Sequence, residues 1–308
     1  MGKPVVVLGI FNADAAYRAP RLPRLGETIM GAGFHLGPGG KGSNQAVAAG
    51  RAGGDVHMIT RLGDDDFAAM ARAVWAEAGV VPHVTVDAES HTGSAFIFLE
   101  EGTGQNAIIV CPGAAGRISV ADIEAQADLI AGAGVFLTQL EQPQEAALAG
   151  LRLARAAGAG TILNPAPAAP LGDEMLALGD LITPNESEAE TLTGLPVTTL
   201  AEAEAAADAL IARGVGAAII TLGATGVLYR RDGRSLHVPA RAPGPVADTT
   251  GAGDAFNGGL ATALAEGQAI ERALRFGIAT AGIAVTRPGA ASAMPRREEI
   301  VDFLASAG

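Results

Sequence analysis

The run Val135-Phe136-Leu137-Thr138-Gln139-Leu140 and the two segments after it decide the fold. An amphipathic stretch at residues 144–157 comes next, and a second apolar run lies at residues 161–164. Continuous apolar runs separated by amphipathic helices are typical of parallel strands covered on both faces. The same alternation recurs along the chain. The sequence therefore predicts an α/β fold, a three-layer α/β/α sandwich with a mostly parallel central sheet.

Two regions depart from this alternation. Residues 14–38 contain no convincing helix, and residues 92–111 suggest a hairpin around the turn Glu101-Gly102-Thr103-Gly104. We expect a single domain, residues 1–308, with strands of a small β-sheet lid inserted at about 14–38 and 92–111. An antiparallel extension of the main sheet also fits the hairpin. The other expected strands are 5–9, 57–62, 180–183 and 218–222, and the other expected helices are 44–52, 67–78, 120–130, 200–213, 252–266, 270–286 and 296–305.

The composition argues against several classes of protein. The chain has 308 residues, a net charge of −12 and no basic run, which disfavours a nucleic-acid partner. The apolar run at its N-terminus is too short for a signal peptide or a membrane span. A lone cysteine, Cys111, forms no intrachain disulfide and fits a reducing compartment. We expect a soluble, cytoplasmic protein without a membrane partner.

The segment Asp248-Thr249-Thr250-Gly251-Ala252-Gly253-Asp254 is a glycine-rich turn that opens an expected helix. Free N–H groups at a helix start attract anions, and glycines let a phosphate approach the backbone. In-line phosphoryl transfer needs a carboxylate base beside such an anion hole, and Asp254 is the candidate. The helix dipole should lower the pKa of Asp254. Alternatively, Asp254 only stabilises the start of the helix.

A second glycine-rich segment is Gly37-Pro38-Gly39-Gly40-Lys41-Gly42-Ser43-Asn44-Gln45. It formally contains G-x-G-x-x-G, but about thirty residues separate it from the first strand, which disfavours a dinucleotide-binding fingerprint. It is not a Walker A loop either, because Gly42 follows Lys41 where Ser or Thr is needed. Lys41 and Asn44, at the start of a helix, suit a polyhydroxy ligand or a transferred phosphate.

Further polar residues follow predicted strands, where ligands bind in open α/β sheets. Asn12, Asp14 and Glu141 suit the hydroxyls of a sugar, although each is also an ordinary turn residue. Asn185 with Glu188 forms a capping pattern or places a carboxylate near a Mg²⁺–phosphate unit. The stretch Thr221-Leu222-Gly223-Ala224-Thr225-Gly226 is a strand end that runs into a glycine turn.

Taken together, these segments resemble the ribokinase (PfkB) family of carbohydrate kinases. The specific motifs are Gly39-Gly40-Lys41-Gly42-Ser43-Asn44-Gln45, Asn185-x-x-Glu188 and Asp248-Thr249-Thr250-Gly251-Ala252-Gly253-Asp254-Ala255-Phe256. The resemblance covers essentially the whole chain and implies a ribokinase-like fold. It also implies transfer of the ATP γ-phosphate to the 5-hydroxyl of D-ribose. Deoxyribose, another sugar or a nucleoside remains an alternative acceptor, and a non-catalytic sugar-sensing protein is a further alternative.

The resemblance also implies roles for individual residues. Sugar contacts would come from Asn12, Asp14, Gly40, Lys41, Asn44, Glu141 and Asp254. ATP would be held by Asn185, Thr221, Leu222, Gly223, Ala224, Thr225, Gly226, Gly253 and Asp254, with Gly251, Ala252 and Gly253 as the anion hole. Glu188 would organise Mg²⁺ through water, and a K⁺ site would involve Asp248, Thr250, Ala284, Arg287 and Gly289. A homodimer through the lid is implied as well.

Two departures from the family pattern concern the sugar pocket and the K⁺ site. Ile10-Phe11 stands where ribokinases often carry the smaller Ser-Ile, so the floor of the sugar pocket should differ. Ala293 replaces a Ser that is often found near the potassium loop, which weakens the case for activation by K⁺.

Overall fold

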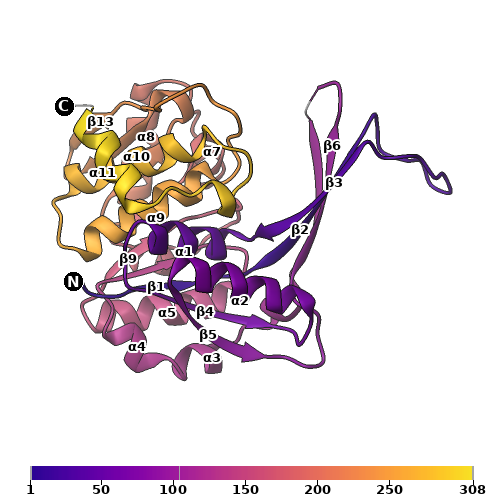
Figure 1. The fold of residues 1–308 in the computed structure, drawn as a ribbon. Coiled ribbons are helices and arrows are strands. Elements are labelled where there is room, and N and C mark those ends of the chain that lie inside the picture. The colour runs from indigo at the N-terminus through magenta and orange to yellow at the C-terminus, as the bar shows by residue number, and fades with distance from the viewer. Residues whose placement is uncertain (1, 104, 307–308) are drawn as a thin grey trace.

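The computed structural model describes residues 2–103 and 105–306, which form two sheets and two layers of helices (Figure 1). Sheet A has nine strands in the order β13-β12-β11-β10-β9-β8-β1-β4-β5. Its first seven strands in chain order are mutually parallel. β12 pairs antiparallel with β11, and β13 pairs antiparallel with β12. The strands are β1 Val5–Leu8, β4 Val56–Leu62, β5 Val80–Val86, β8 Val135–Thr138, β9 Gly160–Leu163, β10 Leu181–Ile182, β11 Ala218–Thr221, β12 Val227–Arg231 and β13 Arg234–Val238.

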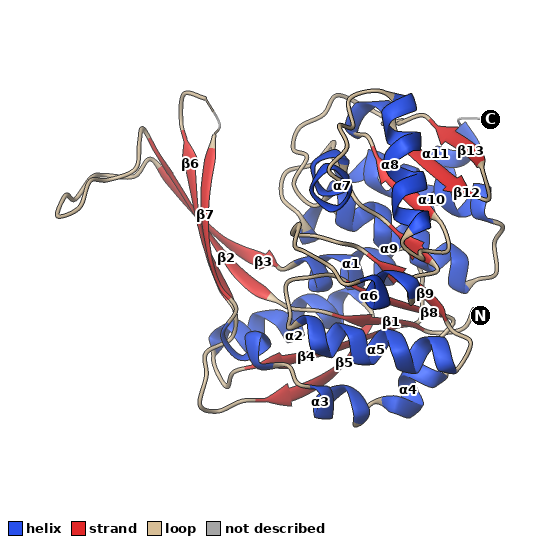
Figure 2. Ribbon diagram, turned by 180° about the vertical axis from the view of Figure 1, so that it is seen from behind, coloured by secondary structure: helices blue, strands red, loops and turns tan. Residues whose placement is uncertain are grey.

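Helices cover both faces of sheet A, each over its own hydrophobic core (Figure 2). The predicted three-layer α/β/α arrangement is therefore confirmed. One face carries α1 Lys41–Arg51, α2 Asp66–Ala78, α9 Ala252–Ala265, α10 Ile270–Ala284 and α11 Arg297–Ser306. The other carries α3 Val120–Glu124, α4 Ala127–Ala131, α5 Gln144–Ala156, α6 Asp173–Ala177, α7 Glu186–Thr193 and α8 Leu200–Ala212.

Three strands of sheet A were not predicted. β5 is exposed or half-buried at most of its positions, so it lacks the continuous apolar run by which its neighbours were found. β12 and β13 form a hairpin around Asp232-Gly233, where both residues have positive φ (49° and 71°). Asp-Gly is the residue pair that such a two-residue turn favours, so the signal was present in the sequence.

The helix expected at residues 120–130 is in fact two helices. Gln126 has φ −111° and ψ 18°, which is not a helical conformation, and it separates α3 from α4. Its side chain forms a hydrogen bond with His83 of β5. The expected helix is therefore interrupted at the residue whose side chain contacts the sheet.

Sheet B projects from the body of the molecule as four long strands (Figure 1). They are β2 Asn12–Ala19, β3 Gly33–Gly39, β6 Ser94–Glu100 and β7 Asn106–Cys111, in the order β3-β2-β6-β7. The expected hairpin is β6 and β7, and it does not extend sheet A. Gly104 of the turn between them lies outside the described residues. Because β2 begins directly after Phe11, sheet B starts at the carboxyl end of β1.

None of the helices in the described ranges has the length and apolar character needed to cross a membrane.

Candidate active site

The carboxyl ends of the parallel strands and the start of α9 enclose a polar cleft of about 210 Å³. Part of its lining comes from the ends of β9, β10 and β11, and part from residues 249–257 at the start of α9. The lining residues are Lys41, Asn164, Ala166, Thr183, Asn185, Glu188, Thr221, Thr249, Gly251, Ala252, Gly253, Asp254 and Asn257. The structure thus gathers residues from both glycine-rich segments, more than 200 positions apart, in one site.

Asp254 lies in the first turn of α9 and is only 6% exposed. Both of its carboxylate oxygens accept hydrogen bonds from α1. Asn44 Nδ2 donates to Oδ2 over 3.0 Å, and Gln45 Nε2 donates to Oδ1 over 2.9 Å. The carboxylate is therefore held in one orientation by two neighbouring amides.

The expectation that the helix dipole lowers the pKa of Asp254 is wrong. Burial raises this pKa, because it removes water from the charged form. The positive charge of Lys41 and the two amide hydrogen bonds act in the opposite direction but do not overcome burial. Asp254 is consequently a stronger base than an exposed aspartate.

The two glycines in the turn before Asp254 have different roles. Gly251 has φ +74°, and a Cβ there would lie 3.0 Å from Cβ of Ala290. Gly253 is exposed, and a Cβ there would meet no atom within 4 Å. The first glycine makes the turn possible, and the second leaves open space against the backbone at the helix start. Such space at a helix start suits a phosphate, although the backbone N–H of Ala252 already donates to the carbonyl oxygen of Thr249 over 3.1 Å.

Gly40, at the start of α1, must approach β1 closely. Its φ is +88°, and a Cβ would lie 2.7 Å from the carbonyl oxygen of Ile10. The next residue, Lys41, donates its backbone N–H to Oε2 of Glu141 over 2.7 Å. Burial would lower the pKa of the Lys41 ammonium, but the carboxylates of Asp254, Glu141 and Glu188 raise it overall. Lys41 therefore remains charged among these acids.

Two acids border this end of the cleft and hold protons at unusually high pH. Burial raises the pKa of Glu141 to about 7, partly offset by Lys41, and Asp254 and Asp14 add to the rise. Burial and the charge of Asp254 raise the pKa of Asp14 to about 6. Asn12 Oδ1 and Asn44 Oδ1 are buried and have no hydrogen-bond partner among the described residues. Unpaired acceptors and clustered carboxyl groups suit a ligand that carries several hydroxyls.

The Ile10-Phe11 departure lies behind this site. Both side chains are fully buried, Ile10 in the core on the α5 side and Phe11 in the core on the α9 side. Phe11 packs edge-on against Trp75 of α2 with 6.0 Å between ring centroids. Their bulk is thus accommodated by the two cores, and only their backbone adjoins Gly40.

Asn185 and Glu188 form a complete capping box at the start of α7. Asn185 Oδ1 accepts from the backbone N–H of Glu188 over 2.8 Å, and Glu188 Oε2 accepts from that of Asn185 over 2.9 Å. Both residues also line the cleft. The capping interpretation is therefore correct, and it does not remove the carboxylate from the site. Burial raises the pKa of Glu188, and the hydrogen bond from Asn185 opposes this rise.

Thr221 lies at the end of β11 and pairs with Asn185 in an isolated bridge. Of the stretch expected to hold ATP, it is the residue that lines the cleft. Gly223, Ala224 and Thr225 continue from it as an exposed 3₁₀ turn. Leu222 and Gly226 are buried beneath that turn and joined by a backbone hydrogen bond of 2.8 Å.

The residues of the suggested K⁺ site lie together beside the anion hole. Asp248 accepts from the backbone N–H groups of Thr250 and Gly289, both over 2.9 Å, and these bonds lower its pKa although burial alone would raise it. Ala284 and Arg287 lie at the end of α10 and are joined by a backbone hydrogen bond of 3.0 Å. Ala293 is buried in the neighbouring 3₁₀ turn.

Within residues 2–103 and 105–306, no three His, Cys, Asp or Glu side chains gather closely enough to hold a metal ion on their own.

Several site residues were not predicted as such. Asn164, Thr183 and Asn257 line the cleft, and Gln45 and Gln139 lie buried behind it. Gln45 lies inside a glycine-rich motif and Asn164 ends a predicted strand. These places in the sequence could have identified both as site residues. Asn257 gave no such signal, because it lies in the interior of α9.

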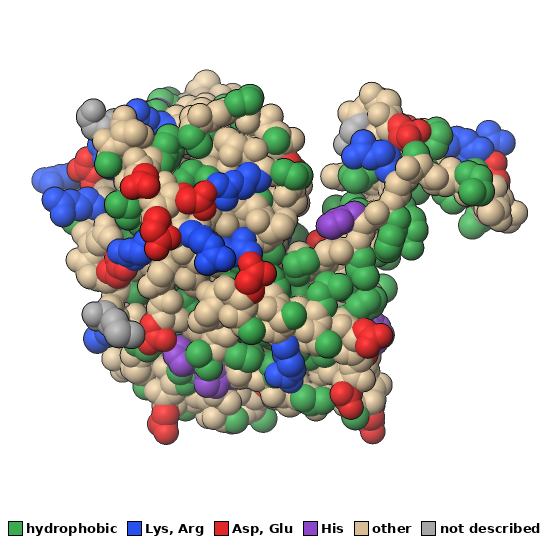
Figure 3. All heavy atoms as spheres, in the orientation of Figure 1, with side chains coloured by type: hydrophobic (Ala, Val, Ile, Leu, Met, Phe, Trp, Pro, Cys, Tyr) green, Lys and Arg blue, Asp and Glu red, His purple; other side chains and the backbone are tan. Residues whose placement is uncertain are grey.

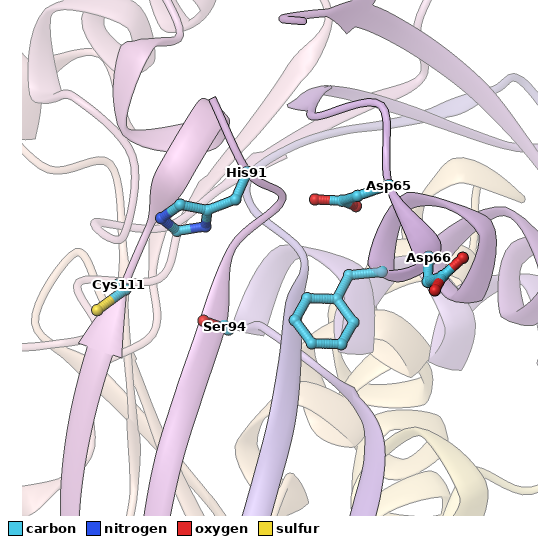
Figure 4. A pocket seen from close by; sticks show the side chains of 6 residues that line it. Asp65, Asp66, His91, Ser94 and Cys111 are labelled. Carbon is cyan, nitrogen blue, oxygen red and sulfur yellow. The ribbon is translucent and has the colours of Figure 1, made fainter. Parts of the chain in front are cut away.

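A separate hollow of about 420 Å³ lies beside the stems of sheet B and shares no lining residue with the cleft (Figure 4). Its polar groups already have structural roles. Asp65 caps α2 and accepts from the backbone N–H of Thr92, and His91 Nδ1 lies 2.8 Å from the Thr92 carbonyl oxygen. Cys111 is exposed at its rim. We regard the cleft, not this hollow, as the candidate active site.

Comparison with known proteins decides the family. The model of the pfkB family of carbohydrate kinases matches residues 3–297. The chain belongs to this family. Among pfkB relatives, a ribokinase of Haemophilus influenzae is 39% identical over 305 residues, which cover 99% of each chain. A deoxyribokinase of Salmonella typhi is 33% identical over 97% of this chain and 98% of its own. The structure of Arabidopsis thaliana ribokinase complexed with ribose and ATP matches with a TM-score of 0.90 at 32% identity, covering 99% of each chain.

Proposed function

We propose that this pfkB-family protein is a ribokinase, which transfers the γ-phosphate of ATP to the 5-hydroxyl of D-ribose. The observation that carries the proposal is the buried carboxylate of Asp254 directly after the open anion hole of Gly251–Gly253. The full-length similarity to ribokinases, one of them solved with ribose and ATP, supports the choice of substrates.

Asp254 accepts the proton of the attacking hydroxyl in this proposal. Burial strengthens it as a base, and the amides of Asn44 and Gln45 keep it in place. The N–H groups at the start of α9 receive the charge of the transferring phosphate. Asn12, Asp14, Gly40, Lys41, Asn44 and Glu141 bind the sugar.

ATP lies against Asn185, the 221–226 turn and Gly253 in this scheme. Mg²⁺ bound with ATP supplies charge neutralisation at the phosphates. Glu188 holds it through water, for which its place in the cleft is suitable. The residues that would hold K⁺ beside the anion hole are Asp248, Thr250, Ala284, Arg287 and Gly289, and a cation there would add positive charge next to the transferring phosphate.

We also propose that residues 1–308 act as one domain in which sheet B is the lid and the site of homodimerisation. Side chains alternate between the two faces of a sheet. Asp14 therefore points to one face of sheet B, and the exposed Tyr17, Phe34 and Phe96 point to the other. The ring centroids of Phe34 and Phe96 lie 4.9 and 5.7 Å from that of Tyr17, and hydrophobic side chains gather along this projection in Figure 3. A second copy would cover that face. The lone cysteine fits a cytoplasmic location.

A panel of acceptors with ADP release as the readout tests the proposal. D-ribose should give the highest kcat/KM, ahead of deoxyribose, other pentoses, hexoses and nucleosides. Because a deoxyribokinase relative shares 33% of its residues with this chain, deoxyribose is the decisive competitor. A higher kcat/KM for deoxyribose would leave the kinase class intact and reject ribose as the substrate.

A further inference from the structure

Gln45 occupies an unusual position behind the proposed base. Its side chain is completely buried, yet every polar atom has a partner. Nε2 donates to Oδ1 of Asp254 over 2.9 Å and to Oδ1 of Asn164 over 3.0 Å, while Oε1 accepts from Nε2 of Gln139 over 2.5 Å. One amide therefore connects α1, α9 and the ends of β8 and β9.

The direction of these hydrogen bonds is fixed by a backbone carbonyl. Asn164 Nδ2 donates to the carbonyl oxygen of Thr183 over 2.9 Å, and a carbonyl can only accept. Asn164 must then turn its oxygen toward Gln45, and Gln45 must turn its NH₂ group toward Asn164. Because an amide NH₂ has two hydrogens, the second one is available for Asp254.

The two oxygens of Asp254 have different surroundings. Oδ1 faces Gln45, which is enclosed by Asn164 and Gln139. Oδ2 faces Asn44, whose own Oδ1 is buried without a partner among the described residues and adjoins the proposed sugar site. A sugar hydroxyl therefore reaches Asp254 from the Oδ2 side.

We propose that Gln45 is a positioning residue for the transfer reaction: it binds Oδ1 of Asp254 and presents Oδ2 to the sugar hydroxyl. This inference rests on the proposed function. Its consequence is that the ionised form of Asp254 depends on Gln45, because a hydrogen bond to a carboxylate favours the charged state. Lys41, Asp14, Glu141 and Glu188 also act on Asp254, but substitutions at position 45 leave them unchanged.

Gln45→Met keeps the length of the side chain and removes the donor. We expect kcat to fall about tenfold, and the acidic limb of the kcat profile to move up by about one pH unit, the size of one charged hydrogen bond. KM for the sugar should change by less than about threefold, because the sugar does not contact Gln45 in this arrangement.

Gln45→Glu is nearly isosteric and gives an effect of opposite sign. A protonated Glu at position 45 still donates to Asp254, but an ionised one repels it. Activity should therefore fall as the pH rises, whereas Gln45→Met loses activity as the pH falls. This second variant also tests the inference if the Met variant does not fold.

Gln142→Met is the matched control. Gln142 is another buried amide, 4% exposed, and it donates to Thr138 Oγ1 and to the carbonyl oxygen of Gln139, not to Asp254. This variant should lower the melting temperature without moving the pH profile. Equal shifts in the Gln45 and Gln142 variants, or a Gln45→Met profile that superimposes on the wild type, would overturn the inference while the kinase assignment stands. A wild type that phosphorylates no acceptor overturns both.

Discussion

The body side and the lid side of the cleft are built differently. On the body side, Asp254 is buried and bonded through both oxygens to amides of α1. On the lid side, Asp14 is half-buried on β2, a strand of the projecting sheet B. The proposed chemistry is thus anchored in packed helices, whereas part of the proposed sugar contact belongs to a separate element. Changes on the body side should therefore act on kcat and changes on the lid side on KM.

The largest effect is expected from Asp254→Asn on the body side. Removing a general base typically lowers the rate by ~10²–10⁴-fold. We expect kcat to fall by that amount, while the affinity for ribose, measured by calorimetry, stays within about threefold because an amide still hydrogen-bonds a hydroxyl. If the variant kept more than about a tenth of the wild-type rate, Asp254 would not be the general base.

Substitutions of two glycines test whether the turn on the body side binds the phosphate. Gly253→Ala places a methyl group in open space where the phosphate is expected, so kcat should fall by ~10²-fold, as for loss of one oxyanion donor. Its melting temperature should not fall, since Ala favours a helix over Gly. Gly251→Ala is the comparison variant. It should lose both activity and stability, because residue 251 has positive φ and adjoins Ala290. Full activity of Gly253→Ala would argue against phosphate binding at this turn.

The lid side is tested by Asp14→Asn and by pH. The substitution should raise KM for ribose by ~10-fold, about the cost of one hydrogen bond to a charged group, and change kcat little.

Protonated carboxyl groups accept hydrogen bonds poorly. KM of the wild type should therefore rise as the pH falls through about 7 and about 6, where Glu141 and Asp14 take up protons. In Asp14→Asn the lower of these two steps should disappear. If Asp14→Asn lowered kcat without changing KM, the proposed difference between the body side and the lid side would be wrong.

The body and the lid also differ in how much of their structure the sequence predicts. Apart from β5, the parallel strands of the body were found because their side chains are buried on both faces and form continuous apolar runs. The lid strands β2 and β3 were expected only within about residues 14–38, without bounds for each strand, because one face of sheet B is exposed and its residues are mixed. In the site, Asp254 and Lys41 were found from glycine-rich turns. Gln45, Gln139 and Asn164 form a network only when α1, β8 and β9 meet, which local sequence cannot reveal.

The same limit explains the wrong expectation for the pKa of Asp254. The position of the residue in the first turn of α9 is visible in the sequence, and it suggests stabilisation of the charge by the helix dipole. Its burial depends on the packing of α9 against α1, which the sequence does not display. Desolvation raises the pKa of Asp254 here and outweighs the opposing effects of Lys41, Gln45 and Asn44.

A smaller effect is expected from Tyr17→Lys on the outer face of the lid. A charge among Tyr17, Phe34 and Phe96 should prevent a second copy from covering this face. Light scattering should show a dimer for the wild type and a monomer for the variant. Leu200→Lys, at an exposed apolar position on α8, is the control and should remain dimeric. A wild type that is monomeric at working concentration would contradict dimerisation through the lid.

The smallest effect is expected from the monovalent cation, since the carboxylate of Asp248 is already held by Thr250 and Gly289. Activity in K⁺ should exceed activity in Na⁺ at equal ionic strength. Asp248→Asn should reduce that difference. Equal wild-type rates in both salts would show that the suggested K⁺ site has no role in turnover.

The position of the transferred phosphate tests the central claim most directly. The protein is incubated with ATP, Mg²⁺ and ¹³C-labelled D-ribose, and the product is examined by ³¹P and ¹³C NMR. We predict a single product, D-ribose 5-phosphate, with phosphorus coupling at C5, and essentially none with Asp254→Asn. Phosphate at another carbon, or equal product formation by the Asp254→Asn variant, would contradict the proposed function.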